Sequence, residues 1–320
     1  MVHIKRLLDE PIICPHMDDR MGGNINGPSL IRVPDWVQNR MGKYYLYFAD
    51  HKGQYIRMAY AHSILGPWTI YVPGVLNVVH SLFESVDPPE PSLNQRPDWA
   101  ASLEGGYLYA HIASPDVHVD TEMHEIRMYY HGLLANGDQQ TRVAYSPDGL
   151  IFTPRSPLLG PPYFRAFAYG EWVYAISWAG VMLRANSWDG PFEAGPVLPD
   201  VSTKERPERL IRHAETHVRD GLLHIFFTCI GDCPERIFHV SVVLSPDWAN
   251  WQASKPALVL EPEQEWEGAD LAVTRSTIGA TAKRLRALCD PCVFEDGEKT
   301  YLLYSGAAES GGIGVVELMF

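Results

Sequence analysis

The chain has 320 residues, of which 46% are apolar and 11% aromatic, and its formal net charge is −13. This composition is typical of a globular protein and excludes an intrinsically disordered chain. An acidic chain without a basic block argues against nucleic acid or an anionic membrane surface as a partner. The opening segment, MVHIKRLLDEPII, lacks the apolar core of a secretion signal, and no run of about 18 apolar residues occurs. We therefore expect a cytoplasmic protein.

A unit of about four short strands recurs along the chain. The units begin near residues 27, 114, 160, 212 and 289, and in each one apolar residues alternate with polar ones between turn signals. Alternation with a period of two predicts β-strands. Because repeats of four short strands are the signature of a β-propeller, we predict an all-β, five-bladed β-propeller that forms one domain over residues 1–320. A β-sandwich with irregular hairpins is the alternative fold.

The fifth unit, which begins with CDPCVFEDGEKTYLLYSG, lacks a fourth strand because the sequence ends at Phe320. The N-terminal segment VHIKRLL can supply that strand, and this pairing would close the ring without leaving an open sheet edge. Residues 73–106 and 255–288 interrupt the repeat as long insertions. Such insertions are either functional or merely tolerated, and these two can help to wall a pocket.

Polar residues gather at one predicted mouth of the propeller channel. First strands start there and second strands end there, because the two run antiparallel. Carboxylates, imidazoles and aromatic rings from distant parts of the sequence would then meet, and charged groups are rarely buried without a purpose. The candidate residues are Asn26, Asp50, His51, Asp116, His131, Tyr163, Arg165, Trp178, His213, Glu215, Asp290 and Glu309, with Asp270 from the second insertion.

The segments ASPDVHV, CDPCVFEDGEKTYLLYSG and GPSLIRV…GKYYLYFAD resemble blade starts of the five-bladed propeller glycosidases of family 43 and the related families 32, 62, 117 and 130. The resemblance spans nearly the whole chain and implies a glycoside hydrolase. In family 43 an Asp in blade one is the general base, an Asp in blade two tunes the acid, and a Glu in blade three is the acid. Asp116 matches the second role. Asn26 and Gly27, and Tyr163 and Arg165, stand where the other two are expected, which implies a divergent catalytic set.

Cleavage of a glycosidic bond needs two carboxyl groups, one of them held protonated by its surroundings. The mouth offers Glu215, Asp290, Asp50 and Glu309 as replacements for the family pair. We predict Asp116, Glu215 and Asp290 as catalytic and the other candidates as substrate-binding. For each carboxylate the alternative is a turn cap or a salt bridge.

Histidines and cysteines raise the question of a metal. The segment RHAETH places His213, Glu215 and His217 on one strand face, which could line the channel. A channel rich in histidine can bind a divalent cation or supply a general base, although a hydrogen-bonded core histidine is the simpler reading of each one. The pairs CIGDC and CDPC approach zinc-ligand spacing, yet small apolar residues would serve equally well there. We assign no metal ligand, and a divalent cation in the channel stays an alternative.

Three functions follow from these residues. The first is a glycosidase that acts on an oligosaccharide or small sugar, with Trp178 and Tyr163 as a platform for the ring. The second is a polysaccharide lyase or metal-assisted sugar enzyme, in which His131 or Tyr163 abstracts a proton and Arg165 or a metal stabilises the anion. The third is a non-catalytic carbohydrate-binding propeller. Because fold alone does not choose among them, we predict the first from the acidic mouth; the sugar, the linkage and the oligomeric state stay open.

Overall fold

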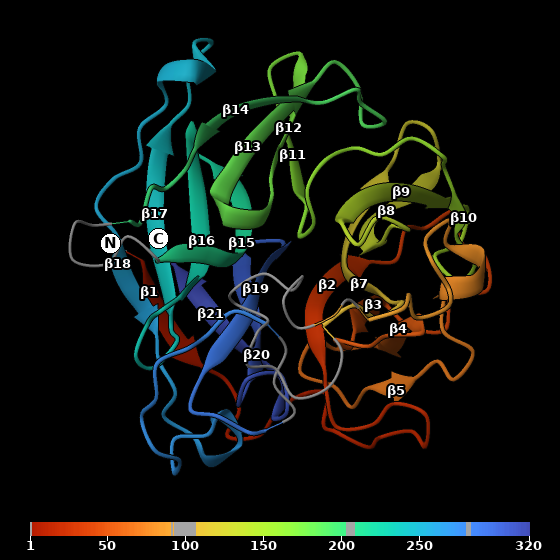
Figure 1. Cartoon of the computed structure of the whole chain (residues 1–320), viewed down its shortest axis with the longest axis horizontal. Helices are drawn as coiled ribbons and strands as arrows, with labels where there is room; N and C mark the ends of the chain where they lie inside the picture. Colours follow the sequence, from red (N-terminus) through yellow and green to blue (C-terminus); the bar gives the residue numbers. More distant parts are fainter. Residues whose placement is uncertain (1, 91, 93–106, 203–208, 280–282) are drawn as a thin grey trace.

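Five antiparallel sheets form a ring in the computed structural model, which describes residues 2–90, 92, 107–202, 209–279 and 283–320 (Figure 1). The predicted five-bladed β-propeller is therefore confirmed. The first blade contains β2 (Asn26–Arg32), β3 (Tyr44–Ala49), β4 (Tyr55–Ala61) and β5 (Thr69–Ile70), with β6 (Leu76–Asn77) also paired to β4. The second contains β7 (Ile112–Asp120), β8 (Glu125–Leu133), β9 (Gln139–Ser146) and β10 (Thr153–Pro154).

The remaining three blades follow the same order from the channel outward. The third contains β11 (Arg165–Tyr169), β12 (Trp172–Ile176), β13 (Val181–Ala185) and β14 (Glu193–Val197). The fourth contains β15 (Leu210–Arg219), β16 (Leu222–Ile230), β17 (Ile237–Val243) and β18 (Ala257–Leu260). The fifth contains β19 (Leu288–Asp296), β20 (Lys299–Gly306), β21 (Gly312–Met319) and β1 (His3–Arg6).

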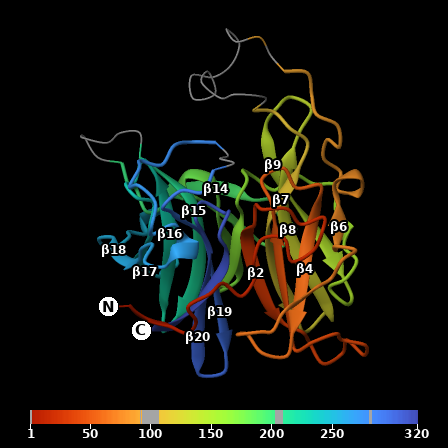
Figure 2. The same cartoon turned by 90° about the horizontal axis from the view of Figure 1, so that it is seen from below.

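The ring closes through its two ends. Strand β1 pairs antiparallel with β21, so that His3 lies opposite Met319 and Arg6 opposite Val316. The N- and C-termini consequently lie side by side at the edge of the fifth blade (Figure 2). This pairing is the closure that the sequence predicted, and it covers the outer edge of β21.

The predicted range of the second insertion, residues 255–288, is partly wrong. Its residues Ala257–Leu260 form β18, the outer strand of the fourth blade, and are paired with β17. The prediction ended the fourth unit before residue 255 and so assigned this strand to the insertion. Trp248, the first residue of η5 (Trp248–Asn250), and Trp251, which follows η5, pack in the core between the third and fourth blades.

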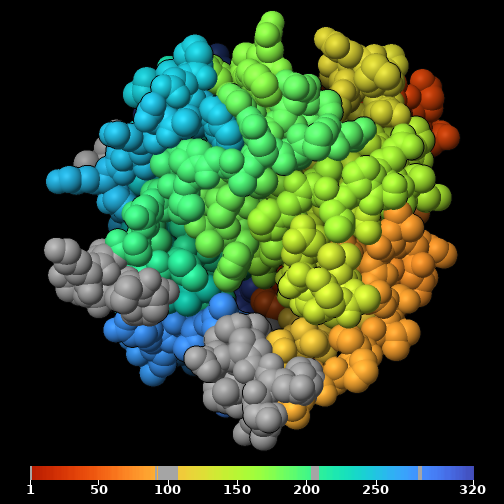
Figure 3. Space-filling model, turned by 45° about the horizontal axis from the view of Figure 1, so that its top comes forward, coloured from red at the N-terminus to blue at the C-terminus, as the bar shows by residue number. Residues whose placement is uncertain are grey.

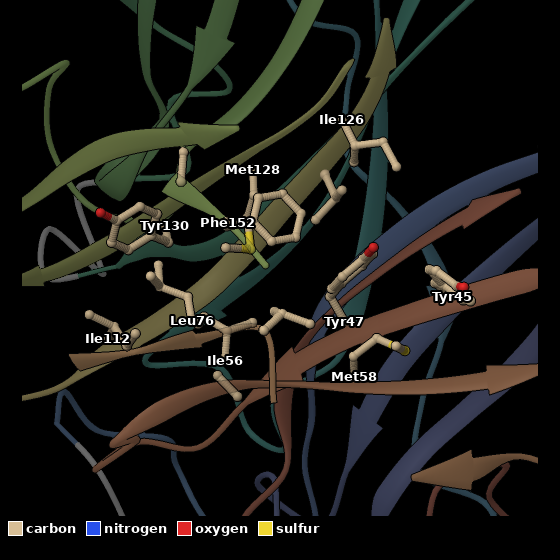
Figure 4. Close-up of a cluster of buried hydrophobic side chains, with 14 of the residues drawn as sticks. Tyr45, Tyr47, Ile56, Met58, Leu76, Ile112, Ile126, Met128, Tyr130 and Phe152 are labelled. Carbon is tan, nitrogen blue, oxygen red and sulfur yellow. The ribbon is translucent and has the colours of Figure 1, made fainter. Parts of the chain in front are cut away.

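Apolar side chains fill the spaces between neighbouring blades. Between the first two blades, Tyr47 and Met58 from one sheet pack with Met128, Tyr130 and Phe152 from the next (Figure 4). Both faces of each inner strand are therefore buried, which explains why β3 is apolar and aromatic throughout rather than strictly alternating. Among the described residues, no helix is long and apolar enough to span a membrane.

Candidate active site

A cavity of about 690 Å³ opens at the channel mouth, on the face that Figure 3 shows as hollowed near its centre. Its wall is formed where first strands begin and second strands end, as the sequence predicted. The predicted residues that line it are Asn26, Asp50, His51, His131, Tyr163, Trp178 and His213. Lining residues absent from the predicted set include Tyr109, His111 and Arg212.

A β-bulge at the start of the first strands aims side chains into this mouth. The strand register slips between Asn26 and Ser29 in the first blade, and corresponding slips occur in the second, fourth and fifth blades. In three of the bulges a residue with positive φ precedes a proline: Gly27 (58°), Ser114 (50°) and Asp290 (51°). Bulges redirect side chains next to functional sites, and the bulge of the second blade places Ser114 in the cavity wall.

The first carboxylate–imidazole pair joins Glu309 to His51. His51 Nδ1 contacts Glu309 Oε2 closely, and the same oxygen accepts hydrogen bonds from Asn26 Nδ2 at 3.0 Å and Asn24 Nδ2 at 3.2 Å. Burial acts to raise the pKa of Glu309, but His51, His213 and the Asn26 hydrogen bond outweigh it and lower the pKa to about 2. Burial opposes protonation of His51, yet the charge of Glu309 raises its pKa. Glu309 is thus ionised and orients His51.

The second pair joins Asp290 to His213. Asp290 Oδ1 lies 3.2 Å from His213 Nδ1, although the two atoms are not aligned as a hydrogen bond. Burial raises the pKa of Asp290 to about 8, and the negative charge of Glu309 adds to the rise. Burial holds the pKa of His213 well below its usual range. At neutral pH we therefore expect a protonated Asp290 beside a neutral His213.

Aromatic rings fill the centre of the mouth. Tyr163 stands between two imidazoles, with its ring centroid 4.7 Å from that of His131 and 4.8 Å from that of His213, and it lies 5.6 Å from Trp178. Burial, followed by the neighbouring His111, lowers the pKa of His131 well below its ordinary value. Burial also lowers the pKa of His111, to about 4. The wall thus presents neutral imidazoles and an aromatic surface, a combination suited to the apolar face and the hydroxyl groups of a sugar.

Two predicted binding carboxylates lie outside these pairs. Asp50 lines the cavity, but Arg57 Nη2 holds its Oδ2 at 2.5 Å. Asp270 follows η6 (Glu265–Glu267) in an exposed turn and is not among the residues that line the cavity. Asp270 therefore lies outside the cavity wall in this structure. The second insertion instead contributes Ile278 and Gly279 to the wall.

Asp116, Glu215 and Arg165 are buried and, like Asp290 and Glu309, are absent from the residues that line the cavity. Asp290 and Glu309 contact the lining residues His213 and His51, whereas Arg165 pairs with Glu215, and we call Asp116, Glu215 and Arg165 the buried ring. Asp116 Oδ2 accepts the backbone N–H of Ala166 at 2.8 Å and contacts His118 Nε2 at 2.8 Å. Arg165 Nε lies 3.5 Å from Glu215 Oε2. Burial alone would raise the pKa of Asp116, but His118 and Arg165 lower it, whereas burial raises the pKa of Glu215 to about 8 against the effect of Arg165.

The same strand position ties neighbouring blades together elsewhere in the ring. Ser29 Oγ in the first blade accepts the backbone N–H of Val117 in the second, at 2.9 Å, just as Asp116 accepts from the third blade. Glu215 in the fourth blade accepts the backbone N–H of Thr216 on its own strand, at 2.7 Å. The structure therefore separates the predicted catalytic trio, with Asp290 beside the cavity and the other two in this ring. Arg165, predicted to bind substrate, is buried with them.

One signal in the sequence could have shown this separation. The prediction placed Asp116 and Asp290 at the same mouth. The bulges show that Ser114, which precedes Pro115, is the equivalent of Asp290, which precedes Pro291. Asp116 lies two residues further along its strand. Aligning the blades on their prolines would have placed Asp290 at the mouth and Asp116 below it.

Comparison with known proteins identifies relatives of this chain. No family model matches it. The "Uncharacterized protein R118" of Acanthamoeba polyphaga mimivirus is 31% identical over 306 residues, which cover 90% of this chain and 82% of R118. The chain belongs to the R118 family.

Solved structures share the fold of this R118-family chain. The GH43 β-xylosidase/α-arabinofuranosidase CoXyl43 from a compost microbial metagenome, in complex with xylotriose, has a TM-score of 0.60 and 13% identity over 99% of this chain and 95% of its own. A GH43_1 enzyme from Xanthomonas citri complexed with xylotriose has a TM-score of 0.57 and 13% identity, and the match covers 97% of this chain and 89% of that enzyme. An N-acetylgalactosamine deacetylase from F. plautii, in complex with blood group B trisaccharide, has a TM-score of 0.56 and 10% identity, and the match covers 98% of this chain and 95% of that chain. At these identities the likeness establishes the five-bladed propeller, in agreement with the family 43 resemblance of the sequence.

Proposed function

We propose that this protein is a glycoside hydrolase-like enzyme that cleaves an oligosaccharide bound in the mouth cavity. The observation that carries the proposal is the pair of buried carboxyl groups, each in contact with an imidazole that lines the cavity. The surroundings push their pKa values apart, to about 8 for Asp290 and about 2 for Glu309. Environments that separate two pKa values in this way identify an acid and a base, which is what glycoside cleavage requires.

The acid would be Asp290 acting through His213. His213 lines the cavity, and its Nδ1 faces the Asp290 carboxyl group. As the glycosidic bond breaks, His213 Nε2–H donates its proton to the leaving oxygen while the proton of Asp290 moves to Nδ1. The 3.2 Å contact would tighten when substrate binds, since catalytic hydrogen bonds are often poorly aligned in the free enzyme.

The base would be His51, held by Glu309. The carboxylate fixes the imidazole through Nδ1 and leaves Nε2 free to accept a proton from water. That water adds its hydroxyl group to the anomeric carbon, so the products together gain one water. Asp290 and Glu309 are positioning residues in this scheme, because each acts through an imidazole. Tyr163 and Trp178 would hold the sugar ring.

A second candidate is hydrolysis of an N-acetyl group on a sugar. The imidazole-rich wall favours it, because a histidine base that activates water can attack an amide carbonyl as well as an anomeric carbon. The structural likeness to the F. plautii N-acetylgalactosamine deacetylase supports the same candidate. His51 would keep its role in that reaction.

Mass spectrometry of products from a panel of plain and N-acetylated oligosaccharides, xylotriose included, tests both candidates. Two sugar fragments that together gain one water support the glycosidase, and release of acetate from an intact glycan supports the second candidate. His51→Gln and Asp290→Asn should each slow turnover by roughly 10²–10⁴-fold, whereas Asp270→Asn, which alters an exposed carboxylate outside the cavity, should leave it unchanged. An unsaturated fragment without added water would refute both hydrolytic proposals.

A further inference from the structure

A compact set of three different donor atoms lies beside the mouth cavity. His213, Cys289 and Glu309 each offer a ligand atom, and these atoms all lie within 4.8 Å of one another. Each side chain belongs to a residue that is at most 5% exposed. The residues come from β15, from β19 and from the turn that follows β20, so strand pairing within one sheet does not by itself bring them together.

Buried polar atoms next to this set lack partners. His213 Nδ1, Asp290 Oδ2 and Asn26 Oδ1 are buried and have no hydrogen-bond partner in the structure. Asp290 approaches His213 at 3.2 Å, and Asn26 donates to Glu309 at 3.0 Å, so these atoms adjoin the three donors. A buried polar atom without a partner calls for an explanation such as a bound ion or water. Three of them around one donor set indicate a missing ligand.

The charges around Cys289 also favour a cation. Its thiol lies in the field of the ionised Glu309 carboxylate, while the neighbouring Asp290 is held protonated and Glu235 faces the opposite charge of Arg212. Arg212 is already engaged, because its Nε lies 2.9 and 3.1 Å from the two oxygens of Glu235. The positive charge of Arg212 is therefore largely compensated before an ion binds.

We propose that His213, Cys289 and Glu309 bind a zinc-class divalent ion, with the remaining coordination position open to the cavity. Nitrogen, sulfur and carboxylate oxygen together suit Zn²⁺, whereas Ca²⁺ and Mg²⁺ prefer sites made of oxygen alone. Three protein ligands with one open position are typical of a catalytic zinc site. His213 lines the cavity, so a ligand in the open position can reach a bound sugar.

This site goes beyond the proposed function and does not depend on it. Binding of the ion requires only the three donors, whichever bond the enzyme breaks. If the glycosidase proposal holds as well, the ion would occupy His213 and would supply Lewis-acid stabilisation of the leaving oxygen, which would then take its proton from water. Asp290, beside His213, then serves as the carboxylate that orients a metal-bound imidazole.

Cobalt titration of the chelator-treated full chain tests the site. Co²⁺ bound to a thiolate absorbs in the near ultraviolet by charge transfer from sulfur, so we expect that band to saturate at one equivalent and to disappear when Zn²⁺ is added. Cys289→Ser should remove the band and weaken Co²⁺ binding by more than about tenfold. Cys292→Ser is the matched control, because Cys292 is also buried in β19 but is not one of the three donors, and it should leave the band intact.

Several results would overturn the proposal. Wild-type protein that binds no Co²⁺, or binds it without a thiolate band, has no such site. Equal loss of the band in Cys289→Ser and Cys292→Ser would also contradict it. If Cys289→Ser does not fold, as judged by circular dichroism, Glu309→Gln replaces it and should weaken binding while keeping the thiolate band. Metal binding without sugar turnover would leave this site standing and refute only the proposed function.

Discussion

Replacing Arg165 by Met would test the interpretation of the buried ring as a structural element. Arg165 lies 3.5 Å from Glu215, donates a hydrogen bond of 2.8 Å to the backbone carbonyl of Pro115, and its charge lowers the pKa of Asp116. Its side chain is only 5% exposed, and that of Glu215 10%. Glu215 is largely protonated at neutral pH, so the charge that Arg165→Met leaves uncompensated is that of the ionised Asp116; removing one partner of a buried charge pair costs about 3–5 kcal/mol. That is a large part of the roughly 5–15 kcal/mol that stabilises a typical domain.

The loss should depend on pH. The pKa of Glu215 is raised to about 8 in the folded protein, above its value of about 4.3 in an unfolded chain. The folded protein therefore holds the extra proton, and its stability falls as the pH rises between these two values. Arg165 limits this fall in stability because its positive charge lowers the folded-state pKa of Glu215. Without it the pKa of Glu215 rises further, so Arg165→Met should lose more stability at pH 8 than at pH 5, where Glu215 is neutral in the folded state.

Urea denaturation at the two pH values, with free energies of unfolding from linear extrapolation, measures this difference. Lys299→Met, which removes a surface pair 3.4 Å from Glu317, should change stability much less and hardly with pH. A loss below about 1 kcal/mol for Arg165→Met, or the same loss at both pH values, would mean that water reaches the ring. The ring would then be accessible enough for Glu215 to take part in chemistry.

The remaining predictions concern the cavity and its bulge. Hydrolysis by chelator-treated protein should slow as the pH rises through about 8, and Asp290→Asn should lower kcat by roughly 10²–10⁴-fold and remove this alkaline limb from the pH–rate profile; a surviving limb would point to another acid. Tyr163→Ala should remove the proposed platform for the sugar ring, so KM should rise more than kcat falls in steady-state assays. An unchanged KM would contradict the role of Tyr163 as a platform. Gly27→Ala should destabilise by about 1–3 kcal/mol on thermal or urea unfolding, since φ is 58° and the new Cβ would lie 2.9 Å from Ser114 Cα. Gly22→Ala has φ of 66° but free space, so an equal loss there would exclude the clash.

The sequence by itself determined the architecture. Alternating apolar residues and turn signals are local, and their fivefold recurrence predicted five sheets without any knowledge of contacts. The missing fourth strand of the last unit predicted that the N-terminal segment pairs with it, as β1 does with β21. The same reasoning failed at β18, because that short strand was assigned to the second insertion although it pairs with β17.

The sequence also predicted that imidazoles and carboxyl groups meet at the mouth, since strand direction alone places His51, His213 and Asp290 there. Only the tertiary structure decided which side chain meets which. Glu309 and His51 lie 258 positions apart and come together because the ring closes between the fifth and first blades. The bulges decided the rest: one extra residue in a strand changes the direction of the side chains that follow, so that Asp290 lies beside the cavity while Asp116 is buried beneath it.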